Sequence, residues 1–272
     1  MSIPRRALFA APLAFAAPAS ATPKAEPWPI WDRHDPDTTT TIDHAPWAKF
    51  LAAHRTEGAD GIARLAYKAA MADRAALDVD ITRLAALPIS RFNRGEQFAY
   101  WVNLYNMVTV LTVLRHYPIK SIRDIKISPG WFSAGPWGAK LIEVEGTKLS
   151  LDDIEHRILR PIWREPRIHY IVNCAALGCP DLSATPVTAA LREAMLDDAA
   201  RSFINHPRGA VIESGRLIVS SIYVWYASDF GPDADSVVQH MRQYAHQDFY
   251  SALSHIRQVS ADRYDWALND AP

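Results

Sequence analysis

The longest apolar segment of the chain predicts a buried central helix over residues 96–116. Its apolar side chains wrap most of the helix circumference, which is typical of a helix buried on all sides. Three amides, Gln97, Asn103 and Asn106, interrupt the segment, and each would be costly in lipid. We therefore expect a helix in a protein core and not a membrane span. Pro118 predicts its C-terminal end.

Shorter patterns around this segment predict further helices and two hairpins, with turns at Glu145-Gly146 and Ser214-Gly215. No repeat or internal linker is visible, so we expect a single α+β domain over residues 43–270. It should be helix-rich around a small mixed sheet. Helices are expected over Trp47–Leu51, Ile62–Leu77, Ser150 to about Pro161, Val187–Phe203, part of Ser220–Ala227 and much of Asp235–Arg257.

Apolar and polar residues alternate from Ile168 to Asn173, and this period of two predicts a strand. Cys174 follows directly, and the next residues, closed by Gly178 and Pro180, read as a loop. The end of a strand is where open sheets usually present reactive side chains. The sequence thus offers a location for chemistry at the loop that holds both cysteines of the chain.

Residues 1–21 have the pattern of a signal peptide: a short basic start, an apolar run too short to span a membrane, and a small-residue cleavage site. We expect an exported, periplasmic protein of bacterial origin without a membrane anchor in the mature chain. Arg5-Arg6 is compatible with twin-arginine export. Residues 22–42 are rich in proline and polar residues and predict an irregular arm.

The formal net charge is -1 and basic runs are absent, which argues against nucleic acid as a partner. No glycine-rich phosphate loop appears, so no nucleotide cofactor is expected. Two cysteines are too few for a disulfide scaffold. Nine tryptophans and ten tyrosines fit either core packing or a groove for a carbohydrate or peptide.

Several sequence blocks resemble the domain-of-unknown-function family 547 and stand in that family's order. The resemblance implies the domain limits and a shared pattern around the blocks, without an activity or a substrate. The blocks are Phe98–Asn106, Ser150–His156 followed by Ile158–Arg160, Pro166–His169 leading to Cys174 and Cys179-Pro180, Ser221–Tyr226 with Asp229-Phe230, and Tyr264–Asn269.

The first functional hypothesis is a cysteine-dependent hydrolase or acyl-transfer enzyme acting on a small molecule or peptide. Cys174 would be the nucleophile and His156 its base. His156 stands beside Glu155 and four residues after an aspartate that can orient its ring. Asn103 and Asn106, about one turn apart, would orient this group or bind a substrate carbonyl.

The alternative is a periplasmic binding or interaction domain in which Cys174 and Cys179 form a structural disulfide, as expected in an oxidising compartment. That bond would remove the nucleophile. In this interpretation His156 is a solvated helix residue, and Asn103 and Asn106 satisfy neighbouring backbone groups.

A Cys/His metal site is a further alternative, formed by Cys174, Cys179, His156 and His169 with Glu155 as base. The spacing contains neither C-x-x-C nor H-E-x-x-H. His169 alternates with the apolar positions, so we expect it to be exposed or hydrogen-bonded and not a ligand.

Overall fold

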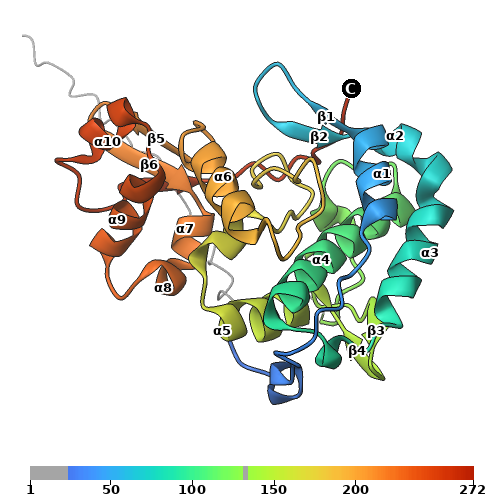
Figure 1. The fold of residues 1–272 in the computed structure, drawn as a ribbon. Helices are drawn as coiled ribbons and strands as arrows, with labels where there is room; N and C mark the ends of the chain where they lie inside the picture. The colour runs from blue at the N-terminus through green and yellow to red at the C-terminus, as the bar shows by residue number, and fades with distance from the viewer. Residues whose placement is uncertain (1–23, 131–133) are drawn as a thin grey trace, which may run out of the picture.

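A computed structural model describes residues 24–130 and 134–272 of the chain (Figure 1). The signal peptide expected over residues 1–21 lies outside these ranges. Between residues 24 and 42 the arm has one regular element, the 3-10 helix η1 (Pro29–Asp32). The N–H of Glu26 donates to the carbonyl of His156 at 3.1 Å, so the arm packs against the rest of the molecule.

Helix α4 (Arg94–His116) is the buried centre of the molecule, as the apolar segment predicted. The side chain of Asn93 caps its first turn by accepting a hydrogen bond from the N–H of Glu96 at 3.0 Å. Every residue from Glu96 to Leu114 is buried. The prediction of a central helix buried on all sides is therefore confirmed.

Other helices surround α4 or form the C-terminal part of the chain (Figure 1). The α-helices are α1 (Ala45–His54), α2 (Tyr67–Ala70), α3 (Arg74–Ala85), α5 (Arg160–Trp163), α6 (Arg192–Ile204), α7 (Ile222–Trp225), α8 (Ala227–Phe230), α9 (Ala234–Tyr244) and α10 (Gln247–Leu253). The further 3-10 helices are η2 (Met71–Asp73), η3 (Ile89–Arg91), η4 (Ile122–Asp124) and η6 (Pro166–Tyr170), and a π-helix covers Asp153–Leu159.

The strands of the described residues form three small sheets. β1 pairs with β2 and β3 with β4, both antiparallel, whereas β6 lies between an antiparallel β5 and a parallel β7. The predicted hairpins and the small mixed sheet are therefore confirmed. The strands are β1 (Arg55–Glu57), β2 (Ala63–Leu65), β3 (Ile142–Val144), β4 (Thr147–Leu149), β5 (Ala210–Glu213), β6 (Arg216–Ser220) and β7 (Ala261–Arg263).

Two clusters of buried apolar side chains meet within this α+β domain. The first is built around α4. The second lies between α6, the sheet of β5 and β6, and α7 to α10, at the left of Figure 1. Tyr170, Phe203 and Tyr223 belong to the second cluster, and their rings contact one another. The segment that ends in Tyr170 therefore joins both parts of the core.

The strand predicted from Ile168 to Asn173 is wrong, because this segment begins with the 3-10 helix η6. Glu165 caps η6 by accepting from the N–H of Arg167 at 3.0 Å, and Pro166 stands in its first turn. Residues 168–173 are all buried, so their alternation does not separate an inner from an outer face. The period of two therefore carried no information about a sheet.

Three helix predictions also need correction. The helix expected over Val187–Phe203 begins only at Arg192. The helix expected over Ile62–Leu77 is wrong at its start, because Ala63–Leu65 forms β2 and pairs with β1. The helix opening at Ser150 begins as predicted: Ser150 Oγ accepts from the N–H of Asp153 at 3.1 Å, and the Asp153 carboxylate accepts from the N–H of Ser150. The helical segment continues beyond the predicted end at Pro161, through Trp163 at the end of α5.

Candidate functional site

The two cysteines face each other across a short loop. Cys174 Sγ lies 2.9 Å from Cys179 Sγ; Cys174 is partly exposed and Cys179 is buried. The sulfurs of a disulfide lie about 2.05 Å apart. The pair is therefore a contact between two thiols, and the expected disulfide is not formed in this structure.

Asn106 and Asn173 hold the chain that leads into this loop. Asn106 donates to the carbonyl of Ile171 at 3.0 Å and accepts from the N–H of Asn173 at 2.8 Å. Asn173 in turn accepts from the N–H of Ala175 at 2.9 Å. Ala175 has a φ of 61°, a left-handed conformation that is costly for alanine and that this network maintains. Asn106 is thus a positioning residue for Cys174.

The C-terminal segment lies along the other side of the loop. The N–H of Leu177 donates to the carbonyl of Ala267, and that of Gly178 to the carbonyl of Asp265, both at 2.8 Å. The Tyr264 hydroxyl lies 3.0 Å from Cys174 Sγ. The sequence patterns did not predict this contact, although Tyr264 is the first residue of one of the blocks that resemble the family.

The surroundings of the two sulfurs favour ionisation of Cys179 over ionisation of Cys174. Cys179 Sγ accepts from the thiol and the N–H of Cys174, each at 2.9 Å, and Arg208 lies nearby. Burial opposes ionisation, but these donors and the Arg208 charge lower the pKa of Cys179. The pKa of Cys174 is raised, first by its hydrogen bond to Cys179 and then by burial. When one of the two thiols ionises, the thiolate therefore forms on Cys179 and Cys174 keeps its proton.

A buried ionic network made of side chains from four helical elements, the π-helix, α5, η6 and α8, lies beside the cysteine loop. Arg160 donates to the Asp229 carboxylate from Nε and Nη2, at 2.6 and 2.9 Å. His169 Nε2 lies 2.8 Å from the same carboxylate, and its Nδ1 lies 3.7 Å from Glu155 Oε1. The ring of Tyr226 stacks on His169 with centroids 4.1 Å apart. Two cations and two carboxylates therefore balance within this network.

The charge states of the network follow from these contacts. Burial would raise the pKa of Glu155, but His156, His169 and Arg160 outweigh it and lower that pKa to about 2. Burial also opposes protonation of His169, yet Asp229 and Glu155 raise its pKa above the ordinary value. These two carboxylates therefore favour the imidazolium form of His169. The expectation that it is exposed or hydrogen-bonded is met by the second alternative, because His169 is buried and hydrogen-bonded.

His156 is buried and neutral. Its Nδ1 lies 3.1 Å from Arg160 Nη1, so Nδ1 accepts and Nε2 carries the proton. Burial lowers its pKa, and the Arg160 charge adds to this. Asp152, four residues earlier, lies 3.7 Å from Nε2, as the spacing predicted. The idea that His156 is a solvated helix residue is wrong.

The structure brings the predicted site residues into two neighbouring groups. Glu155 and His156 belong to the ionic network, whereas Asn106 and the cysteines form the loop site. Within the described residues, no hydrogen bond or ion pair joins His156 to Cys174. Asn103 belongs to neither group: it donates to the carbonyl of Val187 and accepts from its N–H. Both asparagines therefore satisfy backbone groups.

A metal centre finds no support in the described part of the chain. There, no group of three or more histidine, cysteine, aspartate and glutamate side chains is arranged to hold a metal ion. Nor does any helix of that part have the length and apolar character needed to cross a membrane.

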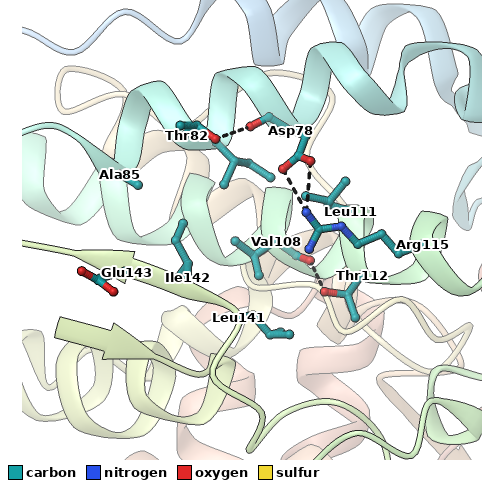
Figure 2. Close-up of a pocket in the computed structure, with 11 residues that line it drawn as sticks. Asp78, Thr82, Ala85, Val108, Leu111, Thr112, Arg115, Leu141, Ile142 and Glu143 are labelled. Atoms are coloured by element: carbon teal, nitrogen blue, oxygen red, sulfur yellow. Dashed lines mark hydrogen bonds and ion pairs between the residues drawn. The ribbon is translucent and has the colours of Figure 1, made fainter. Parts of the chain in front are cut away.

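A cavity of about 270 Å³ lies apart from the thiols, between α3, α4 and β3 (Figure 2). Its wall contains Val108 and Leu111 of α4, and Arg115 pairs with Asp78 at 3.0 Å. Thr112 donates to the carbonyl of Val108, so its hydroxyl hydrogen is already used. No cysteine or histidine lines this cavity, and we assign it no chemistry.

The fold and site define an α+β protein with a pair of thiols beside a buried ionic network. Residues 89–204 match the family described as "Protein of unknown function, DUF547", and this segment belongs to that family, as its motifs indicated. No curated protein and no solved structure matches the chain. The matched segment holds α4, His156, His169 and the cysteine loop, but Asp229 and Tyr264 lie beyond it.

Proposed function

We propose that the protein acts by thiol–disulfide exchange, with Cys174 as the attacking thiol and Cys179 as the resolving thiol. The main support is the 2.9 Å separation of the two sulfurs, one partly exposed and one buried. A shift of about 0.9 Å would bring them to bonding distance. If the protein is exported as residues 1–21 suggest, substrate disulfides and dithiols would be available to it.

The reaction balances without a cofactor. With Cys179 in its thiolate form, Cys174 passes its proton to Cys179 and attacks one sulfur of a substrate disulfide, and the other substrate sulfur leaves as a thiolate. That thiolate takes the proton from Cys179. The Cys179 thiolate then attacks Cys174 Sγ and releases the second substrate sulfur, which is protonated from solvent. The substrate gains two electrons, the dithiol loses two, and the reverse reaction oxidises a substrate dithiol.

Reaction of the reduced protein with dithiobis-nitrobenzoate, followed by intact mass, tests this proposal. The wild-type chain should release two thiolates of the reagent and keep no adduct, because Cys179 displaces the first adduct from Cys174. Cys179→Ser should release one and keep the adduct on Cys174. Cys174→Ser should react slowly, because Cys179 is buried. A wild-type chain that keeps a stable adduct would overturn the proposal.

The second candidate is a cysteine-dependent hydrolase or acyl-transfer enzyme. It is favoured by the partly exposed Cys174 thiol, whose hydrogen bond to Cys179 offers a proton acceptor, and by the Tyr264 hydroxyl at 3.0 Å. Cys174 would attack an acyl carbon, its proton would pass through Cys179 to the leaving group, and water would cleave the thioester. His156 is a poorer base, because Arg160 occupies its Nδ1 lone pair.

An activated aryl ester separates the two candidates. Acyl transfer predicts an acyl adduct on Cys174 that is detected by intact mass. It also predicts that ester turnover stops when oxidation joins Cys174 and Cys179 in a disulfide. Exchange chemistry predicts no accumulation of acyl-enzyme and no ester turnover. A binding domain with a structural disulfide would instead keep its function when both cysteines are replaced by serine.

A further inference from the structure

We propose that four aromatic side chains beside Cys174 form a subsite for an apolar or aromatic group that flanks the sulfur of the substrate disulfide. This inference rests on the proposed thiol–disulfide exchange. We call these four side chains the aromatic subsite. It consists of Trp137, Trp225, Tyr264 and Trp266.

The four rings form one continuous set of contacts. The Trp266 ring centroid lies 4.6 Å from that of Tyr264, 5.6 Å from that of Trp225 and 5.7 Å from that of Trp137. Trp225 and Tyr264 also touch, with centroids 4.9 Å apart. Because the rings come from three separate segments, the fold assembles this surface and local sequence does not.

The aromatic subsite lies where the two apolar clusters meet. Trp137 and Trp266 pack against the cluster around α4, whereas Trp225 and Tyr264 pack against the C-terminal cluster. All four side chains are only partly buried. Ligand sites occur preferentially at such junctions, and large apolar rings gathered at a surface often mark them.

The position of Tyr264 connects this surface to the reactive sulfur. Its hydroxyl lies 3.0 Å from Cys174 Sγ, while its ring contacts Trp225 and Trp266. A substrate sulfur bonded to Cys174 must therefore place its substituents next to Tyr264. Substituents that reach past the hydroxyl meet the two indole rings.

The chemistry of these rings selects the class of substrate. An apolar group gains free energy by covering them, whereas an anionic carboxylate is disfavoured by their negative ring faces. The guanidinium of Arg123 lies over one ring of the aromatic subsite, 5.2 Å from the Trp266 centroid. The position for a cation on that ring is therefore already taken by the protein itself. We therefore assign the subsite to peptide disulfides with an aromatic or large aliphatic residue beside the cysteine, in preference to glutathione disulfide.

Two matched disulfide peptides test the assignment. They have the same length and charge, and carry either phenylalanine or serine beside each cysteine. The reduced wild-type protein should exchange about tenfold faster with the phenylalanine peptide, a ratio typical of one apolar side chain in a pocket. Trp266→Ala and Trp137→Ala should each reduce this preference. Tyr250→Ala removes an exposed ring on α10 and should leave it unchanged.

The outcomes distinguish the inference from the proposed function. Equal rates for both peptides, with exchange at Cys174, would overturn the subsite and leave the exchange activity standing. A preference that persists in both tryptophan variants, each shown to be folded by its unfolding transition, would also overturn it. If neither peptide nor glutathione disulfide reacts, the proposed function falls, and the assigned substrate class falls with it.

Discussion

His169 and Asp229 are joined by a 2.8 Å hydrogen bond between residues that lie 60 positions apart in the chain. His169 belongs to the segment that matches the family, whereas Asp229 in α8 lies beyond the end of that match. The same carboxylate accepts two hydrogen bonds from Arg160. The charges of the family segment are therefore balanced by the C-terminal part of the chain, and the two parts should fold as one unit.

Asp229→Asn should destabilise the fold strongly. It removes the anion that balances Arg160 and His169 in a buried setting, and losing one partner of a buried pair costs about 3–5 kcal/mol. Denaturant unfolding measures the loss. The matched control is Asp248→Asn on the exposed surface of α10, with an expected effect within about 0.5 kcal/mol. Equal effects of the two variants would show that the network adds nothing to stability.

The pKa values of the two histidines of the site should be shifted in opposite directions from the ordinary histidine value. Burial keeps His156 neutral and lowers its pKa, whereas Asp229 and Glu155 overcome burial at His169 and raise its pKa. At pH of about 6.5, the ordinary histidine pKa, NMR spectra of ring-labelled protein should show a mainly neutral His156 with the proton on Nε2 and a mainly charged His169. Histidine-to-glutamine variants assign the signals. Two rings titrating together near the ordinary value of about 6.5 would contradict this charge assignment.

The raised pKa of His169 also fixes a sign for the pH dependence of stability. Its stabilising contribution is complete below the unfolded-state pKa of about 6.5 and is lost as pH rises through the higher folded-state value. The contribution of Glu155 is present above its unfolded-state pKa of about 4.3 and is lost as pH falls toward about 2. The free-energy difference between the wild type and His169→Gln should therefore be largest near pH 5–6 and shrink at higher pH. A difference that is independent of pH would show that His169 does not change charge.

Asn106→Asp should impair both stability and thiol chemistry. The aspartate cannot donate to the carbonyl of Ile171, which leaves a buried acceptor unpaired at a cost of about 1–3 kcal/mol. Because Asn106 also positions the chain before Cys174, the rate of reaction with dithiobis-nitrobenzoate should change. Asn103→Asp is the matched control: it loses a similar bond to Val187, away from the loop, and should keep the wild-type rate.

The sequence predicted the parts of the fold that depend on local patterns. The buried helix α4 followed from an apolar segment without a polar face, and the hairpins followed from turn residues. Glu145 and Ser214 adopt positive φ values of 45° and 52°, each followed by a glycine, as such two-residue turns require. The strand predicted at Ile168 is wrong because the whole segment is buried. Its alternation of residue types therefore does not mark an inner and an outer face of a sheet.

The candidate site was predictable only in part, because its contacts join distant segments. Cys174 and Cys179 lie in one loop, and their proximity followed from spacing. The contacts of His169 with Asp229 and of Cys174 with Tyr264 cross 60 and 90 positions and leave no periodic signal. The predicted pairing of His156 with Cys174 assumed that residues suited to one reaction lie together. In the structure His156 instead accepts a hydrogen bond from Arg160, four residues later.

Gly178→Ala should loosen the contact between the cysteine loop and the C-terminal segment. A Cβ on Gly178 would lie 2.7 Å from the backbone nitrogen and 2.9 Å from the carbonyl oxygen of Asp265, and backbone atoms cannot move aside cheaply. We expect a loss of about 1–3 kcal/mol in unfolding free energy. The same displacement would draw Tyr264 away from Cys174, so alkylation of Cys179 by iodoacetamide should become faster as that thiol loses its cover.

Gly138→Ala provides the matched control, because its nearest neighbouring atoms would lie 3.6 Å from the new Cβ, an ordinary contact. Its alkylation rate should match the wild type. If Gly178→Ala alkylates no faster than Gly138→Ala, the C-terminal segment does not shield the thiols. The contact between Tyr264 and Cys174 would then play no part in controlling access to the buried sulfur of Cys179.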